Sequence, residues 1–509
     1  MKDVTHDTKI SSLDVIEDFE EIAFIAQDAK NKLSQFLRDI QTHVADISPS
    51  VHNQISSETT RFLSFYIQIL SQCSSQISHI KQTPLVTVLQ QARETRESLR
   101  ALLRSHQGIL GTLLTSTDWQ SPSYDHTTYS QAGKQTGTIV ATINDYKRDQ
   151  HRDAFVYERA FLREYIDTTG KLNMLVCATS SGMSACATII QFLLGTLPKN
   201  SHVLSGNSVY FQNKFLLETA FGPNIHTVSE HDPEGIIRIY QNIKPRVLFF
   251  DSLTNAEAIP VVDFSKIIPS IYANATEDTY IVIDNTGLSI SNQFLRTFGK
   301  TPKHIHIILF ESLNKYYQFG MDRVTGGIFW CKGKITDQLF TYRIHAGTNI
   351  PDAIVASLPT PNRTLLTKRL SRLNRNALFV SRTLDQYIRL HPQSPIHAIH
   401  YPGLPSHASY EWMKHATFFG SYFTIELKEF YQSVPVYKRF ITHVFKTAKD
   451  KHVPLVAGSS FGLNTTRIYL TAMRSTPAKP FIRISVGTED WNSIKELSNA
   501  LETALKTFT

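Results

Sequence analysis

The chain has 509 residues, of which 41% are hydrophobic and 19% are charged, the composition of a globular protein with two or three domains. Its net charge of +8 raises the question of nucleic-acid binding, but the basic residues are spread along the chain and form no block or nucleic-acid-binding motif. The first residues are polar and acidic, no stretch approaches the ~20 apolar residues of a membrane span, and the four cysteines lack metal-binding or disulfide spacing. We therefore expect a cytoplasmic protein without a metal, a nucleic-acid partner or a membrane partner.

The first 117 residues have the pattern of a helical extension. Apolar side chains recur at spacings of three and four in 13–46, 51–82 and 84–114, which predicts three amphipathic helices. The segment 118–137 is rich in Ser, Thr, Gly and Tyr and is typical of a linker. Oligomer assembly, partner binding and no separable function all remain open for this extension.

A candidate phosphate site comes next, in residues 175–194. They read as a short strand, a Ser-Ser-Gly turn and a helix. At such a turn the backbone amides of Gly182 and Met183 would hold a phosphate at the positive end of the helix dipole. An ordinary strand-to-helix connection with a serine cap is the alternative.

Three further segments predict an α/β domain with a mainly parallel sheet over residues 138–345. The segments 246–252, 280–284 and 304–310 are apolar, have the length of buried strands, and alternate with helical or loop segments.

Residues 346–509 predict a smaller α+β domain. Two segments alternate like half-buried strands and two have helical periodicity, namely the strands 422–427 and 481–485 and the helices 361–390 and 489–507.

Two residues at the ends of the predicted parallel strands form the pair that pyridoxal phosphate (PLP) chemistry requires. Lys315 offers an amine that condenses with the PLP aldehyde, and Asp284 offers a carboxylate that keeps the pyridine nitrogen protonated, so that the ring accepts electrons. Taken alone, each is more commonly a solvated lysine or a turn-capping aspartate. Both follow strands at the edge where open α/β sheets bind ligands, which makes Lys315 and Asp284 the candidate catalytic residues.

From about residue 138 to the end, the chain resembles the Cys/Met metabolism family of PLP-dependent enzymes, the cystathionine synthase and lyase group of fold type I. The resemblance rests on blocks in the family's order, which are Ser-Ser-Gly-Met (180–183), Ser-Val-Tyr (208–210), Phe-Asp-Ser-Leu-Thr-Asn (250–255), Ile-Asp-Asn-Thr (283–286), Ser-Leu-Asn-Lys-Tyr (312–316), Tyr-Pro-Gly-Leu-Pro-Ser-His (401–407), Ser-Phe-Gly-Leu-Asn-Thr-Thr (460–466) and Ile-Arg-Ile-Ser-Val-Gly-Thr-Glu-Asp (482–490). It implies a fold type I α/β enzyme with a mainly parallel sheet, a smaller C-terminal domain and an extra helical N-terminal region.

The resemblance implies cofactor-binding roles for side chains around Lys315. Tyr210 would stack on the ring and, if neighbouring cations ionise its phenol, accept the amine proton of the incoming substrate. Asn255 would bond the phenolic oxygen. Ser312 would bind phosphate beside Asn314, which stands where the family usually has threonine.

The resemblance also implies which residues bind the substrate and which reach a neighbouring subunit. Arg483 would clamp the substrate α-carboxylate with two parallel charge-assisted hydrogen bonds, and Ser460 would bond nearby. Tyr146 and Arg148 would reach the phosphate of the neighbouring subunit, which implies a homodimer or homotetramer. A solvated charged helix is the alternative for this segment, because the family's Gly-Asn-Pro-Thr is missing after it.

Two departures from the family pattern bear on the chemistry. Glu311 stands where the family has histidine, and Ser459 stands where members that form or cleave cystathionine usually have glutamate. Without that acid, a partner for the distal ammonium of cystathionine is missing, which favours a smaller or less polar amino acid substrate.

The leading hypothesis is thus a PLP-dependent lyase or transferase that acts on a sulfur-containing or γ-substituted amino acid by β- or γ-elimination or γ-replacement. An aminotransferase or decarboxylase on the same fold is the alternative among enzymes. A catalytically silent scaffold, whose N-terminal helices bind partners, is the alternative from another class.

Overall fold

The computed structural model describes residues 2–42, 49–83, 86–116, 147–168, 170, 173–471 and 480–508. The predicted linker 118–137 and Tyr146 lie outside these residues.

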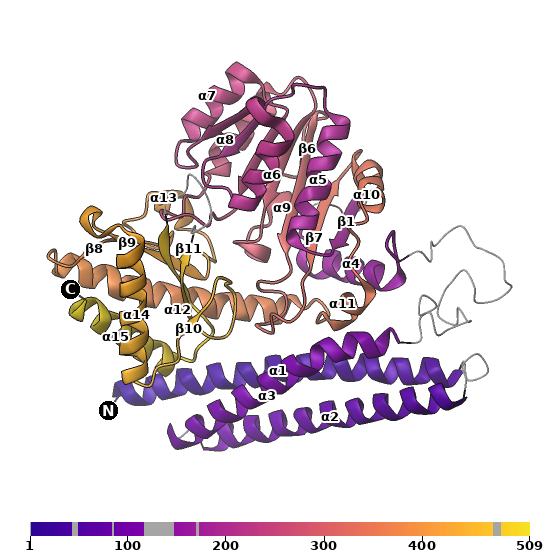
Figure 1. Ribbon diagram of the computed structural model, residues 1–509, viewed down its shortest axis with the longest axis vertical. Coiled ribbons are helices and arrows are strands. Elements are labelled where there is room, and N and C mark those ends of the chain that lie inside the picture. Colours follow the sequence, from indigo (N-terminus) through magenta and orange to yellow (C-terminus); the bar gives the residue numbers. More distant parts are fainter. Residues whose placement is uncertain are drawn as a thin grey trace.

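Three long helices form the N-terminal region, as predicted. They lie side by side beneath the rest of the molecule (Figure 1) and are α1 (Lys2–Thr42), α2 (Pro49–Gln82) and α3 (Val86–Leu114). Helix α1 begins well before residue 13, where the apolar periodicity starts. Tertiary contacts account for the extra turns, because Asp7 accepts a hydrogen bond of 2.8 Å from the indole of Trp491 at the start of the C-terminal helix.

A seven-stranded sheet forms the centre of the large domain. Its strands are β1 (Met174–Thr179), β2 (Val203–Gly206), β3 (Ile225–Val228), β4 (Val247–Asp251), β5 (Thr279–Asp284), β6 (Ile305–Ser312) and β7 (Gly327–Lys332). In the order β1-β7-β6-β5-β4-β2-β3 all pairs are parallel except those of β7, which is antiparallel to both its neighbours. The sheet is therefore mainly parallel, as predicted.

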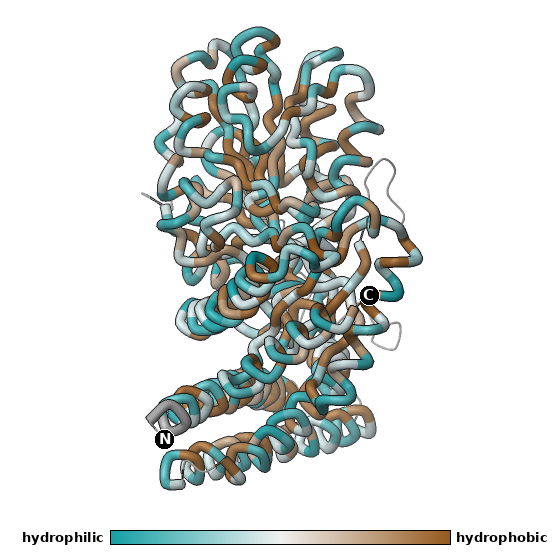
Figure 2. Tube along the Cα trace, turned by 90° about the vertical axis from the view of Figure 1, so that its left-hand side faces the viewer, coloured by the Kyte–Doolittle hydropathy of each residue, from teal (hydrophilic) through white to brown (hydrophobic). Residues whose placement is uncertain are grey.

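Helices cover both faces of this sheet. They are α4 (Arg152–Tyr165), α5 (Gly182–Thr196), α6 (Phe211–Phe221), α7 (Pro233–Ile243), α8 (Phe264–Asn274), α9 (Phe294–Phe298), α10 (Thr336–His345) and α11 (Asp352–Ser357). Successive side chains of β5 point to opposite faces: Tyr280 and Val282 belong to the core beneath α5, α6 and α10, and Ile281 and Ile283 to the core beneath α4, α7 and α8. Because both faces are buried, the central strands β4, β5 and β6 are mostly apolar, and in Figure 2 hydrophobic residues concentrate in the interior of this domain.

The smaller domain has a five-stranded sheet in the order β10-β11-β12-β9-β8. The strands are β8 (Ile396–His400), β9 (Tyr422–Leu427), β10 (Val456–Ala457), β11 (Arg467–Thr471) and β12 (Phe481–Ser485), and the helices are α12 (Arg363–Leu390), α13 (Tyr410–Met413), α14 (Val434–Asp450) and α15 (Trp491–Thr507). The strand predictions at 422–427 and 481–485 are confirmed, as is the helix prediction for α12 to within two residues.

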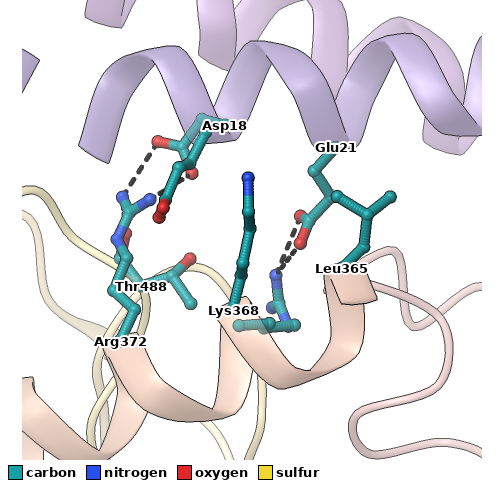
Figure 3. A pocket seen from close by; sticks show the side chains of 8 residues that line it. Asp18, Glu21, Leu365, Lys368, Arg372 and Thr488 are labelled. Atoms are coloured by element: carbon teal, nitrogen blue, oxygen red, sulfur yellow. Dashed lines mark hydrogen bonds and ion pairs between the residues drawn. The ribbon is translucent and has the colours of Figure 1, made fainter. Parts of the chain in front are cut away.

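A buried charge cluster docks the N-terminal helices on this smaller domain. The carboxylate of Asp18 in α1 accepts hydrogen bonds from Arg96 and Arg100 of α3 at 2.7 Å and from Arg372 of α12 at 2.9 and 3.0 Å. Figure 3 shows the Asp18 and Arg372 pair between the two helices. Although burial raises the pKa of Asp18, the three arginines hold it well below its ordinary value.

Two features are absent from the residues that the structure describes. No helix among them is long and apolar enough to cross a membrane. They also contain no group of three or more His, Cys, Asp or Glu side chains arranged to hold a metal ion.

Candidate active site

Lys315 lies just beyond the carboxyl end of β6, as predicted. Its amine donates a hydrogen bond of 3.2 Å to the hydroxyl of Ser460, from the smaller domain, and lies 5.1 Å from the centre of the Phe461 ring. Burial, helped by the positive charge of Arg483, lowers the pKa of the Lys315 amine to about 8. About a tenth of this amine is therefore uncharged at pH 7, and this is the form that acts as a nucleophile or a base.

Asp284 lies at the carboxyl end of β5, again as predicted. Its carboxylate accepts hydrogen bonds from the side-chain amide of Asn213 at 2.9 Å and from the backbone amide of Thr286 at 3.1 Å. Burial raises the pKa of Asp284, and the hydrogen bonds from Thr286 and Asn213 oppose this shift. A buried carboxyl group with a raised pKa fits a partner that brings a proton or a positive charge, such as a protonated ring nitrogen.

A second carboxyl group, that of Asp251, stands beside Asp284 on the adjacent strand β4. One oxygen accepts a hydrogen bond of 2.8 Å from the backbone amide of Tyr210, and the other has no partner among the described residues. Burial and the nearby charge of Asp284 raise the pKa of Asp251 well above its ordinary value. Asp251 therefore anchors the start of α6, which carries Tyr210 toward the site.

The predicted phosphate turn forms the start of α5. The hydroxyl of Ser181 accepts a hydrogen bond of 3.0 Å from the backbone amide of Ser184. The preceding amides of Gly182 and Met183 lie in the first turn, where no helix carbonyl is available as a partner. Gly182 packs so closely on the lysine segment that an added Cβ would lie 3.0 Å from the Cβ of Ser312. The turn and the lysine strand thus meet at one place, with free amides and a helix dipole that fit a phosphate group.

Gly327 of β7 makes this arrangement possible. A Cβ at this position would lie 2.2 Å from the carbonyl oxygen of Ser181 and 2.5 Å from the amide nitrogen of Gly182. Only glycine allows the turn to lie so close to the strand.

Arg483 lies on β12, between β11 and β9, and faces the large domain. One terminal nitrogen donates a hydrogen bond of 2.6 Å to the side-chain oxygen of Asn255, and the other donates to the carbonyl of Ser459. Its Nε has no partner among the described residues. The guanidinium also lies 5.4 Å from the centre of the Tyr422 ring, so it is a buried cation held in place by aromatic and polar neighbours.

Tyr210 stands at the first turn of α6, close to these groups. Burial, followed by the charge of Asp284, raises the pKa of its phenol, and Arg483 opposes that shift. A raised pKa is opposite to the ionisation expected from neighbouring cations, because burial and the charge of Asp284 outweigh the effect of Arg483. The role of Tyr210 as a base stays a prediction.

The other predicted cofactor residues have different surroundings. The side chain of Asn314 donates to the carbonyl of Val324 at 3.2 Å and accepts from the amide of Gly326 at 3.1 Å, so it holds the loop that follows Lys315. Arg148 pairs with Asp149 at 3.0 Å, and its side chain is 60% exposed. Exposure agrees both with contact to a second subunit and with a solvated segment.

Sequence reasoning missed the support of Asp284 by Asn213 and the hydrogen bonds of Glu311. Asn213 lies three residues after Tyr210, the spacing that places two side chains on one face of a helix, and this was the available signal. Glu311 is buried and accepts hydrogen bonds from Asn285 at 2.7 Å and from Tyr317 at 2.5 Å, and burial raises its pKa to about 8. At neutral pH this residue is thus largely a neutral acid at the position where the family has histidine.

Comparisons with known proteins show what this chain is similar to. The bifunctional enzyme flvA of Aspergillus flavus is 24% identical over 351 residues, 68% of this chain and 41% of flvA, so the chain spans less than half the length of that relative. The cystathionine beta-lyase of Coxiella burnetii is 25% identical over 393 residues, 76% of this chain and 92% of the lyase. The crystal structure of a cystathionine gamma synthase from Xanthomonas oryzae pv. oryzae superimposes with a TM-score of 0.58 at 17% identity, over 74% of this chain and 91% of that one.

The fold is therefore that of the fold type I PLP enzymes. The sequence model of the Cys/Met metabolism PLP-dependent enzymes matches residues 113–506, and the described residues within that range include a lysine, an acid, the predicted phosphate turn and a buried arginine around one site. This chain belongs to the family of Cys/Met metabolism PLP-dependent enzymes.

Proposed function

We propose that this enzyme acts on a sulfur-containing or γ-substituted amino acid and catalyses β- or γ-elimination or γ-replacement, in the manner of the cystathionine synthases and lyases. The observation that carries the proposal is the Lys315 amine, partly uncharged through burial, which lies between the acid end of the large sheet and the Arg483 side of the smaller domain. The names of relatives, among them cystathionine beta-lyase and L-methionine gamma-lyase, support the same reaction class.

Each residue would have its own role in this reaction. PLP, when bound, supplies an electron sink for negative charge at the substrate α-carbon. Lys315 would hold the cofactor through its amine, and the same amine would remove the substrate α-proton and later return a proton to carbon. Asp284 would keep a proton on the ring nitrogen. Gly182, Met183 and Ser312 would bind the phosphate.

Arg483 orients the substrate. Its two terminal nitrogens, which now donate to Asn255 and to the Ser459 carbonyl, match the two oxygens of an α-carboxylate. A substrate held in this way presents its breaking bond to the ring in a fixed direction, which lowers the entropy cost of the reaction. Ser459 in place of an acid favours a substrate without a distal ammonium group.

A substrate panel tests the proposal. The purified PLP-loaded protein should release an oxoacid or a thiol from at least one sulfur-containing or γ-substituted amino acid, or should join such an amino acid to an added thiol. The Lys315→Ala variant is the matched blank, because it keeps the phosphate turn and loses the amine. Exchange of amino groups with added oxoacids, or release of carbon dioxide, would instead indicate an aminotransferase or a decarboxylase. A protein that binds no PLP would indicate a silent scaffold.

We also propose that the active unit is a homodimer or homotetramer in the cytoplasm. Apolar side chains that are exposed on α4 and α6, such as Phe155 (54%) and Phe215 (66%), support burial against a second copy. The four cysteines are unpaired and buried, which agrees with a reducing compartment. Sedimentation of the loaded protein measures the assembly, and a fully active monomer would refute this part of the proposal.

A further inference from the structure

Two loops hold Lys315 in place. We call residues 316–326, which follow it, the lysine loop, and residues 458–466, from the smaller domain, the serine loop. Ser460 of the serine loop accepts the hydrogen bond from the Lys315 amine. The backbone of the same loop packs on the backbone of Lys315, because a Cβ added to Gly462 would lie 3.0 Å from the Lys315 carbonyl oxygen. The position of the amine therefore depends on both loops.

The serine loop is fixed by a buried arginine that an N-terminal helix holds. Arg369 of α12 donates hydrogen bonds to the carbonyl of Gly462 at 2.9 Å and to the side chain of Asn464 at 2.8 Å. The other terminal nitrogen of Arg369 donates to both carboxylate oxygens of Glu21 in α1, at 2.8 and 3.0 Å. Both side chains are buried, and Figure 3 shows Glu21 pointing from α1 toward α12. Glu21 thus balances the charge and sets the direction of the guanidinium that holds the serine loop.

The lysine loop also rests on the N-terminal helices. Phe319 is fully buried with a φ of +48°, and Asp322 has a φ of +44°, a region that bulky side chains rarely occupy. Such backbone persists only where the surroundings over-determine it. Phe24 of α1 packs edge-on against Phe319 with ring centres 5.7 Å apart, and Arg104 of α3 donates to the Asp322 carbonyl at 3.4 Å.

These contacts come from helices whose contacting residues lie before residue 113, where the family match begins. We propose that the N-terminal helices are a positioning part of the active site, in which Glu21, through Arg369, fixes the serine loop and Phe24 fixes the lysine loop. This inference rests on the proposed function only in taking Lys315 as the lysine that binds PLP. It gives the extension a role in placing the catalytic amine, which oligomer assembly or partner binding would not require.

The test measures the pH at which the Lys315 amine ionises, and it does not depend on turnover. The full chain is depleted of PLP, and the rate of PLP uptake is followed by visible absorbance across pH. Because the uncharged amine is the nucleophile, uptake should rise with pH around the Lys315 pKa of about 8. Arg369→Met and Phe24→Ala loosen one loop each and admit water to the amine. Each should move the midpoint upward, toward the ordinary lysine value of 10.5, by about one pH unit or more.

Two control variants remove contacts of similar kind that do not touch either loop. Lys368→Met, next to Arg369, breaks the exposed pair with Glu20, which is 3.0 Å long. Phe36→Ala opens a small core formed by α1, α2 and α3, where Phe36 and Ile40 pack with Ile55 and Leu114. Both controls should keep the wild-type midpoint, although Phe36→Ala should lower the stability of the helices.

The outcomes separate this inference from the proposed function. Wild-type midpoints in both Arg369→Met and Phe24→Ala would overturn the inference and leave the proposed function intact. A shift in Phe36→Ala as large as that in Phe24→Ala would also overturn it, because the effect would then be one of general stability. If Arg369→Met does not fold, Phe24→Ala decides. Borohydride reduction of the wild-type holoenzyme that places PLP on a lysine other than Lys315 would refute the residue assignment on which both proposals rest.

Discussion

Replacement of Asp18 by asparagine tests how the N-terminal helices are held. The variant keeps the size of the side chain and removes the charge that three arginines share. The carboxylate is only 3% exposed and accepts four hydrogen bonds of 2.7 to 3.0 Å from Arg96, Arg100 and Arg372. In Asp18→Asn these three cations remain buried and close together without their shared partner.

The magnitude follows from what the buried cations lose. Removing one partner of a buried ion pair costs about 3–5 kcal/mol, because the remaining charge stays desolvated. An exposed pair is worth only about 0–1 kcal/mol, so Lys368→Met, which breaks the Lys368 and Glu20 pair at the same helix contact, is the matched control. We expect Asp18→Asn to lower the free energy of opening of α1 and α3 by about 3–5 kcal/mol, and Lys368→Met by less than about 1 kcal/mol.

Amide hydrogen exchange resolved to α1 and α3 measures these opening free energies. The pH dependence gives a second check. The folded pKa of Asp18 is below its unfolded value of 3.8, so its contribution is fully present above that value and is lost as pH falls below it toward the folded pKa. The difference between wild type and Asp18→Asn should therefore be constant from neutral pH down to about 5 and shrink below about 4. A loss no larger than that of Lys368→Met would show that the cluster contributes no net docking energy.

The remaining predictions concern the active site. Asp284→Asn should lower the turnover rate by on the order of a hundredfold or more, since an amide cannot keep the ring nitrogen protonated, and activity within about threefold of wild type would make Asp284 a structural cap. Lys315→Ala should abolish turnover with unchanged circular dichroism, and peptide mapping of the reduced wild-type holoenzyme should find the cofactor on Lys315. In wild type the rate of PLP uptake should rise between about pH 7 and 9, since burial lowers the pKa of Lys315 to about 8, and a midpoint above pH 10 would mean that the amine is solvated. Arg148→Ala should weaken PLP affinity, and mixing it with inactive Lys315→Ala should restore some activity if dimers share sites, whereas an unchanged affinity would assign Arg148 to a solvated segment.

The sequence by itself was sufficient for the parts of this protein that depend on local pattern. Buried parallel strands are apolar along their whole length, so β4, β5 and β6 could be recognised and their carboxyl ends located. That placed Asp284 and Lys315 at one edge of the sheet. The three N-terminal helices were equally readable, because each has an apolar face with helical periodicity.

Protonation and mutual support were decided only by the tertiary structure. The pKa of Tyr210 is raised and that of Lys315 is lowered because of what packs around them, and neither shift follows from their neighbours in the chain. Asn213 supports Asp284 across 71 positions of sequence. No local pattern encodes which distant side chain completes a buried carboxylate.

The N-terminal region shows the same division most clearly. Its periodicity predicts that each helix has an apolar face. It does not predict which residues contact that face or pair with the buried acids. The contact between Glu21 and Arg369 joins residues 348 positions apart, and it forms because the fold brings Arg369 of α12 to both Glu21 of α1 and the Gly462 carbonyl of the serine loop. A buried charge can be paired only by a cation that the fold brings to it, so the link from α1 to the catalytic lysine could be seen only once the whole chain was folded.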